Sequence, residues 1–150
     1  MPVQIEANID DMVPRLWPHV IDQLLSAGAL GAWATPILMK KGRPAFTLGV
    51  LCEADAVEKL RALIFRETTT IGVRYFEVER QVLERRIDDV DVSGQSIAVK
   101  RASLTADRVV NTSIEWDDVI SAAEGLGLSA KEVLAAAVAA ARRSGPTPSD

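Results

Sequence analysis

Acidic and amide side chains occupy every second position near the start of the chain. Glu6, Asn8 and Asp10 alternate with apolar residues over residues 3–10, and Asp11 follows directly. Because side chains along a strand point alternately to its two faces, this segment predicts a β-strand with one apolar and one polar face. Asp, Asn and Glu are depleted in strands, and their oxygens are the ligands that Mg²⁺, Mn²⁺ and Ca²⁺ prefer. The polar face is therefore a candidate metal site.

A second interpretation of this polar face needs no ligand. An antiparallel sheet that is covered on one side carries polar residues on its wet side, and this alone accounts for Glu6, Asn8 and Asp10. The pair Asp10 and Asp11 is harder to explain in this way, since adjacent carboxylates repel unless a cation or hydrogen-bond donors meet them. The pair favours a bound cation.

A basic turn is the second polar cluster. Lys40, Lys41 and Arg43 surround Gly42 between two segments with strand-like alternation. Gly42 is expected to supply the positive φ that a tight hairpin requires. Such a turn can hold phosphate oxygens through its charges and its backbone N–H groups, although a charged hairpin tip is often only solvated.

Three consecutive threonines form the third cluster. Thr68, Thr69 and Thr70 stand at the end of a helical pattern. Arg66 precedes them and Arg74 follows. Their hydroxyl and amide groups can bind a polar ligand, or they can end the helix by bonding to its last carbonyl groups.

Carboxylates, cations and hydroxyls together form the complement of a metal–nucleotide complex. P-loop and Gly-x-Gly-x-x-Gly motifs are absent from the sequence. The residues themselves therefore predict a domain that binds a metal-complexed phosphate compound.

The composition is that of an ordinary globular chain. Its 150 residues, 48% hydrophobic and 25% charged, suffice for one domain with a core. The net charge of −4 argues against a general nucleic-acid-binding protein.

Cys52 is the single cysteine and is expected to be a buried thiol. Because the chain also has only one histidine, it lacks the usual nitrogen and sulfur ligands for zinc or nickel. No apolar run is long enough to cross a bilayer and no leader precedes the first strand, so we predict a soluble cytoplasmic protein with no membrane partner.

The order of the predicted elements indicates the fold class. Patterns in residues 1–84 predict the order β-α-β-β-α-β of a ferredoxin-like domain. This α+β fold packs two helices on one face of an antiparallel sheet, leaves the other face open and places the first strand at the centre. The predicted strands are 3–10, 32–39, 45–52 and 73–83, and the predicted helices are 14–27 and 55–68.

The remainder is predicted to extend the same domain. Residues 85–143 predict a C-terminal β-hairpin and a two-helix extension, and residues 144–150 predict a disordered tail. The predicted segments are hairpin strands 87–92 and 96–101, a short strand 108–112, and helices 115–124 and 130–143.

Three segments resemble one known family. Glu6–Met12, Thr35–Pro44 and Phe65–Arg74 are similar, in the same order, to the C-terminal region of the LarC nickel-insertion proteins, and the similarity extends over residues 3–142. The resemblance implies a CTP-dependent cyclometallase, a nickel chelatase of the lyase class. Such an enzyme inserts nickel into pyridinium-3,5-bisthiocarboxylic acid mononucleotide to form the nickel-pincer cofactor of lactate racemase, while CTP is cleaved to CMP and pyrophosphate. In that family the C-terminal region binds CTP with a divalent ion.

The resemblance also implies roles for the three polar clusters. The first strand would supply the ligands of Mg²⁺ or Mn²⁺: Asp10, Glu6, Asn8 and Asp11. The basic turn and the threonine segment would bind the CTP: Lys40, Lys41, Arg43, Arg66, Thr68, Thr69 and Arg74. Nickel would be the inserted metal, and no catalytic residue is assigned.

The N-terminal half of the LarC family has no counterpart in this sequence. We therefore expect a partner that supplies that half, encoded separately or removed, and we expect a homo-oligomer. One alternative is a non-catalytic oligomerisation or scaffold module, since open ferredoxin-like faces and an Ala-rich last helix suit self-association. Another is a small-ligand sensor built on the same topology.

Overall fold

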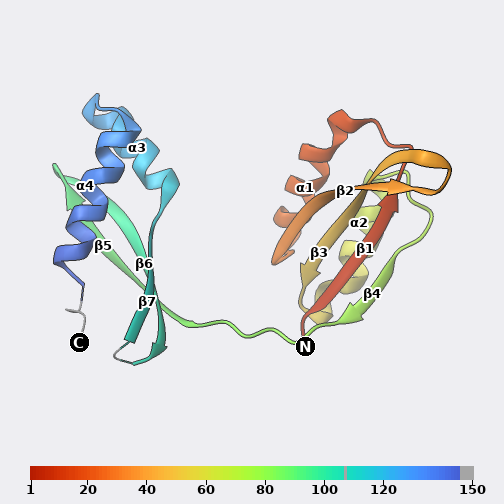
Figure 1. Cartoon of the computed structure of the whole chain (residues 1–150), viewed down its shortest axis with the longest axis horizontal. Helices are drawn as coiled ribbons and strands as arrows, with labels where there is room; N and C mark the ends of the chain where they lie inside the picture. The colour runs from red at the N-terminus through yellow and green to blue at the C-terminus, as the bar shows by residue number, and fades with distance from the viewer. Residues whose placement is uncertain (107, 146–150) are drawn as a thin grey trace. The chain divides into compact units, whose positions relative to one another are not determined.

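The chain forms two compact units, each with its own hydrophobic core (Figure 1). The computed structural model describes residues 1–106 and 108–145. The first unit spans Met1–Arg80 and the second Gln81–Asp150. Where the sequence predicted one domain with an extension from residue 85, the structure has a separate second core, because the last two helices pack on a sheet of their own.

The first unit is a four-stranded antiparallel sheet with two helices. Its order is β2-β3-β1-β4, and every neighbouring pair is antiparallel. This order confirms the ferredoxin-like prediction and the central place of the first strand. The elements are β1 (Val3–Ile9), η1 (Pro14–Leu16), α1 (Trp17–Ser26), β2 (Gly31–Met39), η2 (Lys40–Gly42), β3 (Arg43–Cys52), η3 (Ala54–Ala56), α2 (Val57–Glu67) and β4 (Arg74–Glu77), where η marks a short 3₁₀ turn.

Alternation along β1 decides which face of the first sheet is covered. Every second residue from Val3 to Ile9 is buried, whereas Glu6 is half-buried and Asn8 is exposed. The buried side packs on helices α1 and α2, which lie on the same face (Figure 1). The helices contribute fully buried aliphatic side chains at helical spacing, each worth about 1.5–3 kcal/mol: Val20, Leu24, Leu60 and Ile64. The polar side of β1 therefore lies on the open face.

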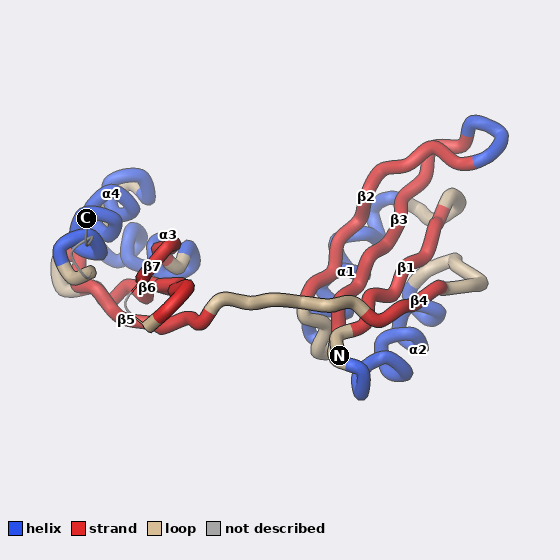
Figure 2. The backbone as a smooth tube through the Cα atoms, turned by 60° about the horizontal axis from the view of Figure 1, so that its bottom comes forward, coloured by secondary structure: helices blue, strands red, loops and turns tan. Residues whose placement is uncertain are grey.

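The strands that flank β1 differ from it in length. β4 ends at Glu77, although a strand to residue 83 was predicted, because Glu77 already pairs with Val3 at the start of β1. At the other end the hairpin of β2 and β3 runs past β1, whose last residue, Ile9, pairs with Phe46 (Figure 2). The basic turn is the tip of this projecting hairpin.

The second unit is a three-stranded antiparallel sheet of order β5-β6-β7 with two helices packed on it. Ser93 and Gly94 join the first two strands with positive φ values of 52° and 86°, the conformation whose twist suits a two-residue hairpin turn. Ser129 and Glu132 form a capping box at the start of the last helix. The elements are β5 (Glu84–Val92), β6 (Gln95–Thr105), β7 (Arg108–Ile114), α3 (Trp116–Leu126) and α4 (Ala130–Arg143).

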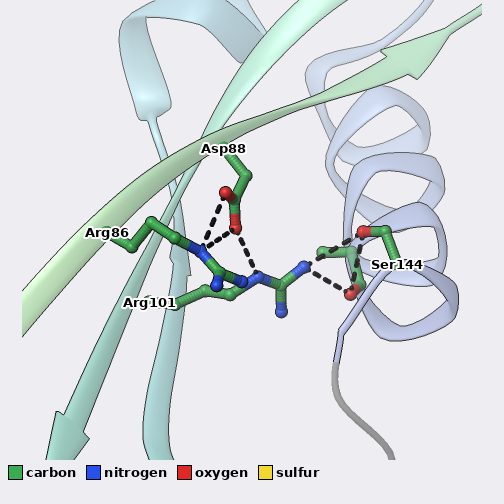
Figure 3. Close-up of polar contacts among 5 residues, drawn as sticks. Arg86, Asp88, Arg101 and Ser144 are labelled. Atoms are coloured by element: carbon green, nitrogen blue, oxygen red, sulfur yellow. Dashed lines mark hydrogen bonds and ion pairs between the residues drawn. The ribbon is translucent and has the colours of Figure 1, made fainter. Parts of the chain in front are cut away.

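A buried arginine joins the second sheet to the end of α4 (Figure 3). Arg101 on β6 is only 3% exposed. Its Nε donates to Asp88 on β5 at 3.1 Å, and its Nη2 donates to the Ala141 carbonyl at 2.8 Å and to the Ser144 hydroxyl at 3.0 Å. The last carbonyls of a helix have no partner within the helix, so this guanidinium both satisfies α4 and fixes it on the sheet. Arg86 contacts the same Asp88 carboxylate from an exposed position, at 2.9 Å.

Two predictions concern the rest of the chain. Within the described residues, no helix is both long and apolar enough to span a membrane. Of the tail predicted to be disordered, Ser144 ends α4 and residues 146–150 lie outside the described residues.

Replacing Arg101 by Met should make the second unit easier to unfold. The variant keeps an apolar stem but leaves Asp88 with the exposed Arg86 alone and removes the 2.8 Å hydrogen bond to the Ala141 carbonyl, so we expect the free energy of unfolding to fall by about 2–4 kcal/mol. Urea denaturation followed by circular dichroism measures this change. Arg86→Met is the matched control, because an exposed contact to the same carboxylate is worth less than about 1 kcal/mol. Equal effects of the two substitutions would contradict the role of the buried guanidinium.

Candidate functional site

The central position of β1 gives its polar side chains neighbours on both flanking strands. The register sets Glu6 opposite Arg74 on β4, and Asn8 opposite Thr47 on β3. Directly opposed residues of an antiparallel pair share a face and have Cβ atoms about 4.5–5.5 Å apart. Tertiary pairing thus brings the predicted metal ligands of β1 beside residues from distant parts of the chain, on the open face.

Arg74 holds two of the predicted metal ligands together. Its Nε donates to Glu6 Oε2 at 2.9 Å, and its Nη2 lies 2.7 Å from the same oxygen. Nη2 also donates to Asn8 Oδ1 at 3.2 Å, and the Thr47 hydroxyl donates to that oxygen at 2.9 Å. Gln4 donates to the other oxygen of Glu6 at 2.6 Å. Both carboxylate oxygens of Glu6 and the amide oxygen of Asn8 are therefore met by donors from the sheet itself.

The adjacent carboxylates at the end of β1 are also met by donors. Asp10 Oδ2 accepts a hydrogen bond from Arg43 Nη1 at 3.2 Å, and Asp11 Oδ1 accepts one from the Thr69 hydroxyl at 2.5 Å. These bonds link the basic turn and the threonine segment to the acidic strand. The three predicted clusters thus meet at this end of the first sheet, through one cation and one hydroxyl.

Not every predicted site residue takes part in these contacts. Arg66 donates instead to its neighbour Glu67 at 2.7 Å. The Thr68 hydroxyl donates to the Ile64 carbonyl at 2.7 Å, which is the helix-ending role that the sequence left open. Sequence analysis missed Gln4 and Thr47, whose alternate-position spacing on strands was their only signal.

The basic turn is exposed and has an uncommon backbone. The expected positive φ of Gly42 is confirmed at 68°, and Lys41 adopts a positive φ of 63° as well. For a residue with a side chain this left-handed conformation costs about 1–2 kcal/mol. The turn presents the exposed cations Lys40 and Lys41 at the tip of the hairpin, beside Arg43.

The donor set fits a cation that arrives with phosphate groups. Among residues 1–106 and 108–145, no three His, Cys, Asp or Glu side chains form a group that could hold a metal ion by themselves. Mg²⁺ in phosphate-binding sites is commonly held by one or two carboxylates plus phosphate oxygens and water. Asp10 and Asp11 offer two such carboxylates. A metal–nucleotide complex would supply the remaining oxygens.

Two other features of the described chain share no residue with this site. Cys52 is fully buried, as predicted, and burial raises the pKa of its thiol, so it stays protonated and unreactive. The second unit contains a hollow of about 340 Å³ that shares no residue with the predicted site. It is lined by Asp89, Val90, Asp91, Ala140, Arg143 and Ser144.

The two units define an α+β protein with a ferredoxin-like sheet whose open face carries opposed carboxylates and arginines. The model of the nickel insertion protein family matches residues 2–134. The chain therefore belongs to the nickel insertion protein family.

Two curated relatives are named pyridinium-3,5-bisthiocarboxylic acid mononucleotide nickel insertion protein. The relative from a Nocardioides species is 52% identical over 141 residues, which are 94% of this chain and 36% of the relative. The relative from a Thermotoga species is 39% identical over 131 residues, which are 87% of this chain and 32% of the relative. The chain spans about a third of the length of these relatives.

Two solved structures are similar to this chain. One is LarC2, described as the C-terminal domain of a cyclometallase involved in the synthesis of the NPN cofactor of lactate racemase. It matches with a TM-score of 0.85 and 35% identity, over 94% of this chain and 96% of that chain. A protein from Methanopyrus kandleri matches with a TM-score of 0.67 and 27% identity, over 96% of this chain and 88% of that chain. The likeness to LarC2 confirms the resemblance to the C-terminal region of the LarC family.

Glu67 should contribute a pH-dependent part of the stability. Its hydrogen bond from Arg66, followed by the contact with His19, lowers the pKa of its carboxyl group below the usual value. A lowered pKa in the folded state stabilises the protein above the unfolded-state pKa of about 4.3, and this stabilisation is lost as pH falls through the folded-state pKa. The melting temperature of the unsubstituted chain should therefore exceed that of Glu67→Gln at pH 7, and the gap should close below about pH 4. A gap that stays constant from pH 7 to pH 3 would contradict this assignment.

Proposed function

We propose that this chain binds CTP together with Mg²⁺ or Mn²⁺, as the C-terminal part of a nickel chelatase. The chelatase would insert nickel, which is a substrate, into pyridinium-3,5-bisthiocarboxylic acid mononucleotide while CTP is cleaved to CMP and pyrophosphate. Membership of the nickel insertion protein family supports the reaction. The observation that carries the site is the direct contact of carboxylates on β1 and directly after it with arginines from both neighbouring strands, on one open face.

The arginines of the site can exchange one anion for another. Arg74 contacts Glu6 and Arg43 contacts Asp10. Phosphate oxygens bind a guanidinium with the same forked geometry as a carboxylate. When a triphosphate engages these arginines, Asp10 and the Oε2 atom of Glu6 lose their donors, and Asp10 becomes available to the cation that accompanies the triphosphate. Cation and nucleotide then favour each other's binding, which is positive coupling between the two ligands.

The exposed positions of the arginines support this exchange. The side chains of Arg43 and Arg74 are 56% and 52% exposed. Exposed ion pairs of this kind contribute about 0–1 kcal/mol, so opening them costs little. Lys40 and Lys41 add positive charge at the hairpin tip, where the outer phosphates of a bound triphosphate would lie.

The remainder of the chelatase would come from a further segment or partner. The relatives are about three times as long as this chain, which supports a first part that supplies the rest of the lyase activity. We propose that the two parts meet in the cytoplasm and that the chain forms a homo-oligomer.

An oligomerisation or scaffold module is the second candidate function. The open face of the first sheet favours it, because helices of this unit cover only the opposite face. The Ala-rich helix does not add to it, since Ala137 and Ala141 are buried in the core of their own unit.

Isothermal titration calorimetry with CTP and ATP, each with and without Mn²⁺, tests the proposed site. We expect binding that is selective for CTP and at least tenfold tighter with Mn²⁺, because the cation and the phosphates share the site. Absence of nucleotide binding, both for the chain alone and with the first part of a relative added, would leave the scaffold function in its place.

Two substitutions test the charged side chains of the site, and one of them does so without straining the backbone of the basic turn. Asp10→Asn should weaken Mn²⁺-dependent CTP binding about tenfold or more, since a cation prefers a carboxylate. Lys41→Gly should weaken it several-fold but should not lower the melting temperature, because glycine accepts the positive φ at this position. Lys131→Ala, an exposed lysine on α4, is the matched control and should change neither quantity. Tighter or unchanged binding by Asp10→Asn would contradict its role.

A further inference from the structure

Trp33 lies flat on the open face of the first sheet. The register places it opposite Gly49 on β3, which is in turn opposite Glu6 on β1. A Cβ atom on Gly49 would come within 2.4–2.6 Å of three atoms of the indole, so the ring lies directly over the β3 backbone. A glycine within a strand often marks such a close approach, because only glycine leaves room for it.

The indole is seated on one side and accessible on the other. Gly49 is buried beneath it, whereas 39% of Trp33 stays exposed. A strand-interior glycine weakens a sheet and an exposed indole forgoes part of its hydrophobic stabilisation. Core packing does not require this arrangement, since the ring lies on the face opposite the helices. A flat ring with a free π-surface is what stacking on another planar ring requires.

Polar groups continue from the indole in a fixed order along the sheet. Glu6 and Arg74 lie in the same cross-strand row as Trp33, and the guanidinium of Arg74 reaches into the next row, where it donates to Asn8. The next row on this face, roughly 6.8 Å along the strands, carries hydroxyl and amide groups: Thr35, Thr47 and Asn8. Asp10 and its partner Arg43 come after it. A nucleotide presents its groups in the same order, from planar ring to sugar hydroxyls to phosphates.

We propose that Trp33, seated on Gly49, is the stacking surface for the planar ring of a mononucleotide whose sugar and phosphates extend along β1 toward Asp10. This inference rests on the proposed nucleotide site and deepens it. Two rings have the required chemistry: the cytosine of CTP and the pyridinium of the mononucleotide for which the relatives are named. Both stack on an indole, and the pyridinium adds a cation–π attraction.

Calorimetric titration of the unsubstituted chain and of Trp33→Ala with three probes tests the inference. The probes are CTP with Mn²⁺, nicotinamide mononucleotide as a pyridinium nucleotide, and inorganic triphosphate with Mn²⁺ as a ligand without a ring. Loss of a stacking aromatic weakens the binding of a base by about 5- to 150-fold. We expect this loss for CTP if cytosine occupies the indole, or for nicotinamide mononucleotide if a pyridinium does, and no change for triphosphate.

A matched pair of glycine substitutions tests whether the indole must lie on Gly49, with the indole itself still present. Gly49→Ala would push the ring off the β3 backbone and should produce the same selective loss as Trp33→Ala. Gly31→Ala is the control, because its Cβ would lie 3.6 Å from the indole, an ordinary contact distance, and should leave all affinities unchanged. Circular dichroism checks that each variant is folded. If Gly49→Ala is not folded, the test of the stacking role rests on Trp33→Ala alone.

The outcomes separate this inference from the proposed function. If Trp33→Ala binds every probe as the unsubstituted chain does, while triphosphate binds to both, the stacking role is overturned and the phosphate site stands. If the unsubstituted chain binds none of the three probes, either alone or with the first part of a relative added, both are overturned.

Discussion

The bonds from Arg74 to Glu6 and Asn8 are the interaction on which the open face depends. β4 has four residues, none of them buried, so it is attached to β1 by its ladder hydrogen bonds and by this guanidinium. Glu6 lies on the central strand, where a carboxylate with neither a donor nor a cation beside it would be costly. Arg74 removes that cost and at the same time holds β4 against β1. It also brings the segment that follows the threonines beside the acidic strand.

Each unit has an arginine that bonds to side chains or carbonyl groups of a neighbouring element, and the two arginines differ in how exposed their side chains are. The side chain of Arg101 is 4% exposed and bonds to a helix carbonyl, so its contacts are a permanent part of the second core. The side chain of Arg74 is 52% exposed and faces carboxylate and amide oxygens that a cation could also bind. Breaking a buried ion pair costs several kcal/mol, whereas an exposed pair contributes about 1 kcal/mol or less. Arg74 can therefore change partner without loss of the fold, whereas Arg101 cannot.

The proposed site requires that the two faces of the first sheet differ in polarity. Helices α1 and α2 cover one side with aliphatic residues, which leaves the other side free for charge and for the indole of Trp33. Gly49 serves the open face alone, since its missing side chain is what admits the indole. One constraint thus accounts for both the charged contacts near the end of β1 and the indole ring in the row of Glu6: the central strand is apolar on one side and polar on the other.

Local patterns in the sequence were enough for the element order and the ferredoxin-like sheet, because alternation and helical spacing are properties of neighbouring residues. The same patterns placed Glu6, Asn8, Asp10 and Asp11 on or beside the polar face of the first strand, and placed Gly42 at a positive φ. Other features depended on contacts between distant residues. β4 stopped at Glu77 because β1 begins at Val3, Thr68 bonded to its own helix, and Arg101 became buried because α4 ends beside it. The second core, the Arg74 fork and the seat of Trp33 were likewise decided only by tertiary structure, because register and packing join residues that no local pattern links.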